Sequence, residues 1–157
     1  MAVKYFAYGS NMAEAVMTER SSRHRFLGVA RLPEHRLMFN RRSVRTGSGV
    51  ADVVPAAGES VWGVLYELDD PGLAALDSKE GYDWAYVREP LDVELVSDGS
   101  RQPAVTYTVK EKEPAEVEPS TEYLEGIISA ATERGLPAAY IDGLRELRGR
   151  VSREHHS

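Results

Sequence analysis

The stretch Tyr5-Phe6-Ala7-Tyr8-Gly9-Ser10-Asn11-Met12 decides how this chain begins to fold. Residues 3–8 are apolar and aromatic, which predicts a mostly buried strand. Gly9-Ser10-Asn11 follows with residues that tolerate unusual backbone angles and cap helices, and helix formers begin at Met12. Such a strand–turn–helix leaves backbone N–H groups without partners. It is either an ordinary turn or a pocket for an anionic substrate group or a developing oxyanion. In the second case we expect Gly9 to provide a positive φ or a close approach.

The composition is that of a globular protein, with 42% hydrophobic and 28% charged residues among 157. We expect one domain over residues 1–150 and a polar C-terminal tail over residues 151–157. The net charge of −6 argues against a nucleic-acid partner, because phosphate binding needs clustered Lys and Arg. No run approaches the length of a membrane span. The sequence therefore predicts a cytoplasmic protein, monomer or homodimer, whose partner is a small molecule.

Several kinds of chemistry are excluded by residue type. The chain has no cysteine, which rules out disulfides and thiolate catalysis. Its four histidines, His24, His35, His155 and His156, lack the spacing of metal ligands. No Gly-Lys-Ser/Thr phosphate loop is present. We therefore expect neither a metal ion nor another cofactor.

The pattern of apolar residues predicts strands first and helices last. Predicted strands cover 3–8, 25–32, 36–40, 50–54, 61–68, 86–96 and 104–109, with Pro33 separating the second from the third. Predicted helices follow Gly9, run from an Asp cap beside Pro71 to Gly81, from Ser120 to Gly135, and onward from Pro137. The predicted class is α+β, with a mixed, curved β-sheet or small β-barrel flanked by helices.

Glu80 is an unusual residue for its position. It lies at the predicted C-terminal end of the helix that stops at Gly81, where free carbonyls already carry partial negative charge. This partial negative charge should raise the pKa of its carboxyl group and make it a better general base near neutral pH. The alternative is a surface glutamate paired with Lys79 or a nearby arginine.

Motifs along most of the chain resemble those of the γ-glutamylcyclotransferase family, also called AIG2-like. Residues 5–12 look like its glycine-loop signature, and 61–66 look like the strand before its second motif. Residues 76–82, followed by Tyr86, are similar to the segment that carries its catalytic glutamate. Residues 119–123 and 135–140 resemble later segments, so the matches run in the family's order from residue 3 to residue 148.

This resemblance implies a function and a set of site residues. The implied reaction is attack of a substrate's α-amino group on its own γ-glutamyl carbonyl, which gives 5-oxoproline and releases an amine or amino acid. Glu80 would be the general base and then the general acid. The substrate-binding residues would be Tyr8, Gly9, Ser10, Asn11, Met12, Tyr86, Tyr107 and Tyr123, although each tyrosine can instead be a core residue with a satisfied hydroxyl.

Three functions stay open at this point. The protein is a cyclotransferase for γ-glutamyl amino acids, an enzyme that removes a γ-glutamyl protecting group from a biosynthetic amine, or a non-catalytic binding protein. The glutathione-specific branch usually has Leu at Asn11, and the γ-glutamylamine branch has Thr-Leu at Ser10 and Asn11, so this chain departs from both. Arg41, Arg42 and Arg45 are candidates for the leaving-group side, or a solvated basic loop.

Overall fold

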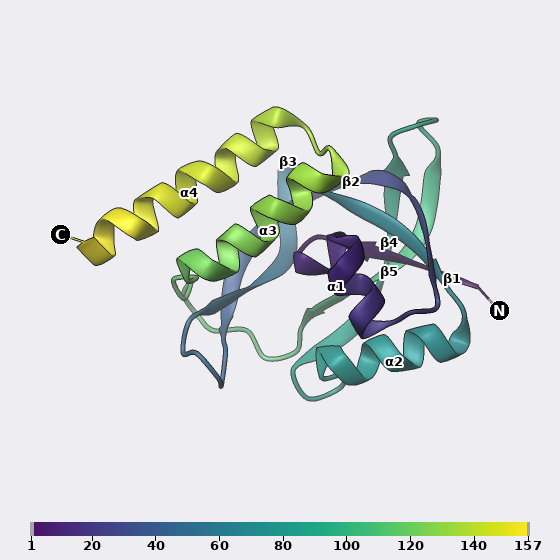
Figure 1. Cartoon of the computed structure of the whole chain (residues 1–157), viewed down its shortest axis with the longest axis horizontal. Coiled ribbons are helices and arrows are strands. Elements are labelled where there is room, and N and C mark those ends of the chain that lie inside the picture. Colours follow the sequence, from purple (N-terminus) through teal and green to yellow (C-terminus); the bar gives the residue numbers. More distant parts are fainter. Residues whose placement is uncertain (1, 157) are drawn as a thin grey trace.

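The computed structural model describes residues 2–156, with side chains through Arg153, as a β-barrel and a set of helices (Figure 1). The strands are β1 (Val3–Ala7), β2 (His24–Arg42), β3 (Gly49–Leu68), β4 (Tyr86–Leu95) and β5 (Arg101–Val109). The helices are the 3-10 turn η1 (Ser10–Met12) and α1 (Glu14–Arg20), α2 (Asp70–Glu80), α3 (Thr121–Arg134) and α4 (Ala138–His156).

The five strands close into a barrel in the order β1-β3-β2-β4-β5. The neighbours within this order pair antiparallel, and the barrel closes through a parallel contact between Tyr5 of β1 and Val105 of β5. Closure gives the short strand β1 a neighbour on each side, so no edge of it is left to pair with another chain. The predicted class, α+β with a small β-barrel, is confirmed.

The two longest strands replace four predicted ones. β2 continues through Pro33, and β3 continues from the predicted strand at 50–54 into the one at 61–68. The register between them shifts after Pro33, where Glu34 adopts a φ of 60°. The residue left out of the register is Glu34, because Pro33 pairs with Ser60 and His35 pairs with Pro55. Proline is tolerated beside such a β-bulge, so the strand continues past Pro33 and the predicted break there is wrong.

The helix signals are mostly accurate. Asp69 caps α2 by accepting a hydrogen bond from the Gly72 N–H at 2.8 Å, and Ser120 caps α3 by accepting from Tyr123 N–H at 3.1 Å. Gly135 ends α3 in the left-handed conformation, with a φ of 74°. The tail set apart at residue 151 is not a separate segment, because α4 continues to His156 and Val151 is buried.

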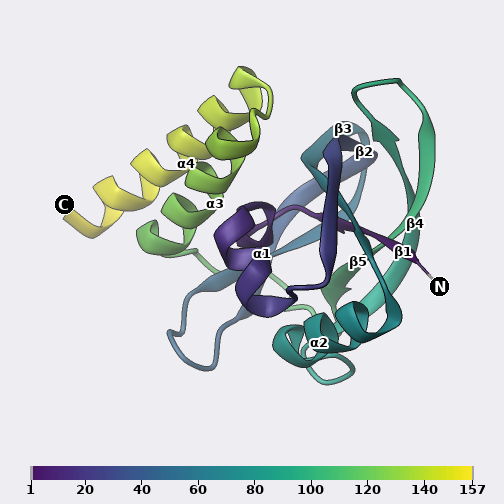
Figure 2. The ribbon, with the colours of Figure 1, turned by 45° about the vertical axis from the view of Figure 1, so that its right-hand side comes forward.

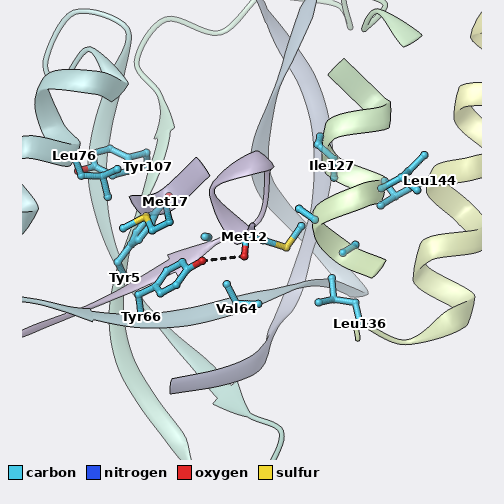
Figure 3. Packing of buried hydrophobic residues seen from close by; sticks show 14 of the residues in the cluster. Tyr5, Met12, Met17, Val64, Tyr66, Leu76, Tyr107, Ile127, Leu136 and Leu144 are labelled. Atoms are coloured by element: carbon cyan, nitrogen blue, oxygen red, sulfur yellow. Dashed lines mark hydrogen bonds between the residues drawn. The ribbon is translucent and has the colours of Figure 1, made fainter. Parts of the chain in front are cut away.

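The helical layer holds the first turn of the chain in the core. α3 and α4 lie side by side, and α1 lies between α3 and α2 in both views of the ribbon (Figures 1 and 2). Met12 and Ile127 are fully buried in one apolar cluster, which joins η1 to α3 (Figure 3). The end of β1 is thereby fixed between the barrel and the C-terminal helices.

Candidate active site

A cavity of about 210 Å³ opens where β1 ends. Its walls come from β1, the turn after it, the last residues of α1 and α2, β2, β3, β4, β5 and α3. The lining residues are Tyr5, Tyr8, Gly9, Ser10, Asn11, Arg20, Arg41, Val50, Ala51, Glu80, Tyr86, Tyr107 and Tyr123. The structure thus brings together every residue predicted for the site except Met12.

The turn after β1 presents backbone donors to this cavity. Its hydrogen bonds run from Met12 N–H to the Gly9 carbonyl and from Ala13 N–H to the Ser10 carbonyl, each 3.1 Å long. The N–H groups of Ser10 and Asn11 lie at the start of this turn, where N–H groups have no partner within the turn, and both residues line the cavity.

Gly9 does not need the left-handed region. Its φ is −119°, so the expected positive φ is wrong. A Cβ atom built on Gly9 would meet no atom within 4 Å. The missing side chain therefore leaves open space in the wall of the cavity.

Met12 belongs to the core and not to the cavity. Its side chain is fully buried, and its carbonyl accepts hydrogen bonds from Tyr66 Oη at 2.9 Å and from Arg134 Nε at 2.7 Å (Figure 3). Tyr66 Oη also donates to the carbonyl of Asn11 at 2.8 Å. These contacts fix the turn from the side opposite the cavity.

Glu80 is the carboxylate at the centre of the site. It is the last residue of α2, and Gly81 after it adopts a φ of 64°. Oε1 accepts a hydrogen bond of 2.8 Å from the amide of Asn11, which also donates to Tyr5 Oη at 2.9 Å. Among the ion pairs of the described residues none includes Glu80, so the alternative of a surface pair with Lys79 or an arginine is wrong.

The surroundings of Glu80 favour its neutral form. Burial raises the pKa of its carboxyl group above the ordinary value, while the amide of Asn11 and the positive charge of Arg20 lower it by less. A carboxyl group of this kind exchanges protons closer to neutral pH than a solvated glutamate does. It therefore suits general acid–base catalysis.

The predicted tyrosines are both walls and hydrogen-bonding groups. Tyr8 Oη donates to the carbonyl of Tyr107 at 2.6 Å, Tyr107 Oη to Asp77 Oδ1 at 2.5 Å, and Tyr86 Oη to the carbonyl of Ala51 at 3.1 Å. Tyr123 Oη instead accepts from Ala51 N–H at 2.9 Å. Burial raises the pKa of Tyr123 to about 12, so its hydroxyl keeps its proton at neutral pH.

The three basic candidates divide into one residue of the site and two outside it. Arg41 lines the cavity, with its guanidinium carbon 5.6 Å from the ring centre of Trp84 and 5.9 Å from that of Tyr86. Arg42 donates to the carbonyl of Gly47, and Arg45 is exposed on the same loop. Neither Arg42 nor Arg45 lines this cavity.

Sequence reasoning missed Tyr5 and Arg20. Tyr5 was assigned to the strand as a core residue, yet its hydroxyl reaches the amide of Asn11 inside the cavity. Arg20 ends a helix, where a cation is ordinary, so nothing local distinguished it from a solvated residue. Tyr5 and Arg20 become part of the cavity wall only when α2 and α3, which are distant in sequence, pack around the turn after β1.

Among the side chains that the structure describes, no group of three or more His, Asp or Glu residues is arranged to hold a metal ion. No helix within residues 2–156 is long and apolar enough to cross a bilayer.

The fold is a small closed barrel whose tyrosine-lined cavity holds the carboxylate of Glu80. Residues 60–144 match the AIG2-like family. The γ-glutamylcyclotransferase of Bos taurus is 32% identical over 161 residues, which cover 96% of this chain and 84% of the bovine protein. The Homo sapiens protein of that name is 31% identical over 160 residues, with the same coverage.

A solved structure described as a γ-glutamyl cyclotransferase superposes with a TM-score of 0.84 at 29% identity, covering 92% of this chain and 87% of the other. The chain therefore belongs to the AIG2-like, or γ-glutamylcyclotransferase, family.

Proposed function

We propose that this protein is a γ-glutamylcyclotransferase, which converts a γ-glutamyl amino acid or γ-glutamyl amine to 5-oxoproline and releases the free amine. The observation that carries the proposal is the Glu80 carboxylate, which faces the cavity, has no cationic partner within hydrogen-bond distance and has a raised pKa. The family relationship supports the same reaction.

The first step is removal of a proton from the α-ammonium group of the substrate. Glu80 accepts this proton, and Asn11 keeps the receiving carboxylate oriented by its 2.8 Å hydrogen bond. The neutral amine then attacks the γ-carbonyl carbon of the same molecule, and a new C–N bond closes the five-membered ring. Because both reacting groups belong to one molecule, holding the γ-glutamyl arm in a bent shape supplies much of the rate.

The second step is collapse of the tetrahedral intermediate. The backbone N–H groups of Ser10 and Asn11 are free to stabilise its oxyanion. As the oxyanion collapses, the bond to the leaving nitrogen breaks and Glu80 returns its proton to that nitrogen. The ring nitrogen loses its second proton, which the released amine takes up to become an ammonium ion. One amide bond replaces another, and no water is consumed.

The leaving group has two candidate classes, amino acids and biosynthetic amines. Arg41 lies in the cavity wall with its guanidinium against Tyr86 and Trp84, and the indole of Trp84 is 66% exposed. A cation and an exposed aromatic ring at the same wall suit either a carboxylate or an apolar group on the departing amine.

The test is a mass-spectrometric screen of the purified protein against a panel of γ-glutamyl amino acids and γ-glutamyl amines. We expect release of 5-oxoproline by the wild type and at least a hundredfold less by Glu80→Gln, following the usual range for a lost general base of about 10²–10⁴-fold. In ¹⁸O-water the initial product should carry no label. Labelled glutamate would make the protein a hydrolase, and binding without turnover would make it a non-catalytic binding protein.

A further inference from the structure

Arg20, the last residue of α1, lies in the wall of the cavity and forms no ion pair with any described residue. Its Nε is buried and makes no hydrogen bond. A buried donor left unpaired costs free energy, so its retention calls for a group that is absent from the free protein.

The surroundings of Arg20 restrict what this group is. Its positive charge acts on Glu80, Tyr5 and Tyr123, which line the same cavity. Arg41, the other arginine of the wall, lies instead against Tyr86 and Trp84. Of these two guanidinium groups, that of Arg20 is the one whose charge lowers the pKa of Glu80.

We propose that Arg20 binds the α-carboxylate of the γ-glutamyl group. The proposal rests on the function proposed above. In any γ-glutamyl compound the α-carboxylate and the α-ammonium are attached to the same carbon atom, so the residue that binds one must lie next to the residue that deprotonates the other. Guanidinium is suited to this task because its N–H donors match the two oxygens of a carboxylate.

This assignment decides between two roles for the turn after β1. If Arg20 takes the α-carboxylate, the N–H groups of Ser10 and Asn11 are left for the oxyanion that forms at the γ-carbon. The pair Arg20 and Glu80 then complements the carboxylate and the ammonium of the substrate's head group. The recognised class is any amide of glutamate's side chain that has both groups free.

The experiment compares two substrates that differ only in this carboxylate. One is a γ-glutamyl compound that the wild type accepts, and the other is its 4-aminobutyryl counterpart, which cyclises to 2-pyrrolidinone by the same attack. The proteins are the wild type, Arg20→Met, Arg20→Lys and, as a matched control, Arg25→Met. Arg25 is exposed and pairs with Glu67 outside the cavity. The readout is the ratio of kcat/KM for the two substrates in each protein.

We expect the wild type to prefer the carboxylated substrate, and Arg20→Met to lose about 10- to 100-fold of that preference, the range for hydrogen bonds to a charged group. Arg20→Lys should lose less, and Arg25→Met should keep the whole preference. A merely structural role for Arg20 would lower both rates together and leave the ratio unchanged, which would overturn the proposal.

Two outcomes keep the test decisive if Arg20→Met does not fold. Equal kcat/KM values of the wild type for the two substrates would overturn the role of Arg20 alone, because turnover itself would still be present. Failure of the wild type to form 5-oxoproline from any γ-glutamyl compound would overturn the proposed function and, with it, this assignment. Loss of the preference in Arg20→Lys supports the proposal without the methionine variant.

Discussion

Two carboxylates lie one turn apart on α2 and have opposite surroundings. Asp77 forms an ion pair of 3.0 Å with Arg88 and accepts a 2.5 Å hydrogen bond from Tyr107 Oη. Glu80 has no cationic partner of this kind and accepts one hydrogen bond, from the neutral amide of Asn11. Glu80 lines the cavity directly, whereas Asp77 contacts it through the hydroxyl group of Tyr107.

The difference lies in what each carboxylate is free to do. Asp77 is paired with the guanidinium of Arg88, and it accepts the hydrogen bond that fixes the direction of the Tyr107 hydroxyl. Glu80 gains little from its neighbours when charged, so burial raises its pKa and leaves it able to exchange a proton. One carboxylate organises a wall of the cavity, and the other is suited to react.

The largest expected effect separates the two carboxylates by activity. Glu80→Gln keeps the shape of the side chain and removes the base, so kcat should fall by about 10²–10⁴-fold. The measurement is the rate of 5-oxoproline formation by folded, purified variants. A Glu80→Gln variant with a rate near that of the wild type would show that another group is the base.

The acidic limb of the pH–rate profile should report the pKa of Glu80. The base must be deprotonated, so kcat/KM should fall as the pH drops through a pKa that lies above the usual range for glutamate. The amide of Asn11 lowers this pKa, so Asn11→Ala should move the limb to higher pH. A limb that stays in place or moves to lower pH in this variant would contradict the assignment.

Asp77→Asn should have a smaller effect on turnover than Glu80→Gln. The variant weakens the hydrogen bond that orients Tyr107 and leaves the reacting groups in place. We expect kcat/KM to fall by about 2- to 10-fold, which corresponds to one hydrogen bond of ordinary strength. Tyr107→Phe removes the same bond from its other end and is the matched variant. If kcat/KM fell equally in Asp77→Asn and Glu80→Gln, the proposed difference in role between the two carboxylates would be wrong.

The smallest expected effects are on thermal stability, where Glu80→Gln should raise the Tm and Asp77→Asn should lower it. A folded-state pKa above the unfolded value means that stability is fully present below the unfolded pKa and declines as the pH rises through the folded one. At pH 7 the buried, charged carboxylate of Glu80 therefore lowers the stability of the fold. Glu80→Gln removes this loss and should raise the Tm at pH 7, and the difference between the variant and the wild type should vanish in acid. Asp77→Asn breaks a pair with the partly exposed Arg88 and should lower the Tm by a few degrees, from a loss of about 1 kcal/mol. Thermal unfolding at pH 7 and pH 4 measures both.

Local rules were enough to predict the end of β1 and the end of α2 at Glu80, whereas the roles of Glu80 and of the other site residues were implied by the family resemblance. A glycine turn after an apolar strand, and a carboxylate at the wrong end of a helix, are both visible in a few consecutive residues. Their convergence on one cavity agrees with the predicted set of site residues, apart from Met12.

The features that were not predicted depend on segments distant in sequence. Met12 turns into the core because α3 packs against the turn, and nothing between residues 5 and 12 encodes that direction. β2 continues past Pro33 because the register with β3 shifts there, from Ser60 to Pro55. Arg20 is unpaired only because the walls of the cavity come together around it. Each is a property of packing, which a local pattern does not contain.

The hydrogen bond from Arg134 to the Met12 carbonyl joins residues 122 positions apart in sequence. A growing chain therefore cannot complete the support of the Gly9–Met12 turn until α3 has been synthesised and docked, although that turn is among the first segments made. Contacts of such long sequence separation form late, because a large loop must close first. The site consequently matures with the whole fold, and recovery of turnover during refolding should coincide with docking of α3 and not precede it. Catalytic activity would then serve as a built-in report that the last third of the protein is in place.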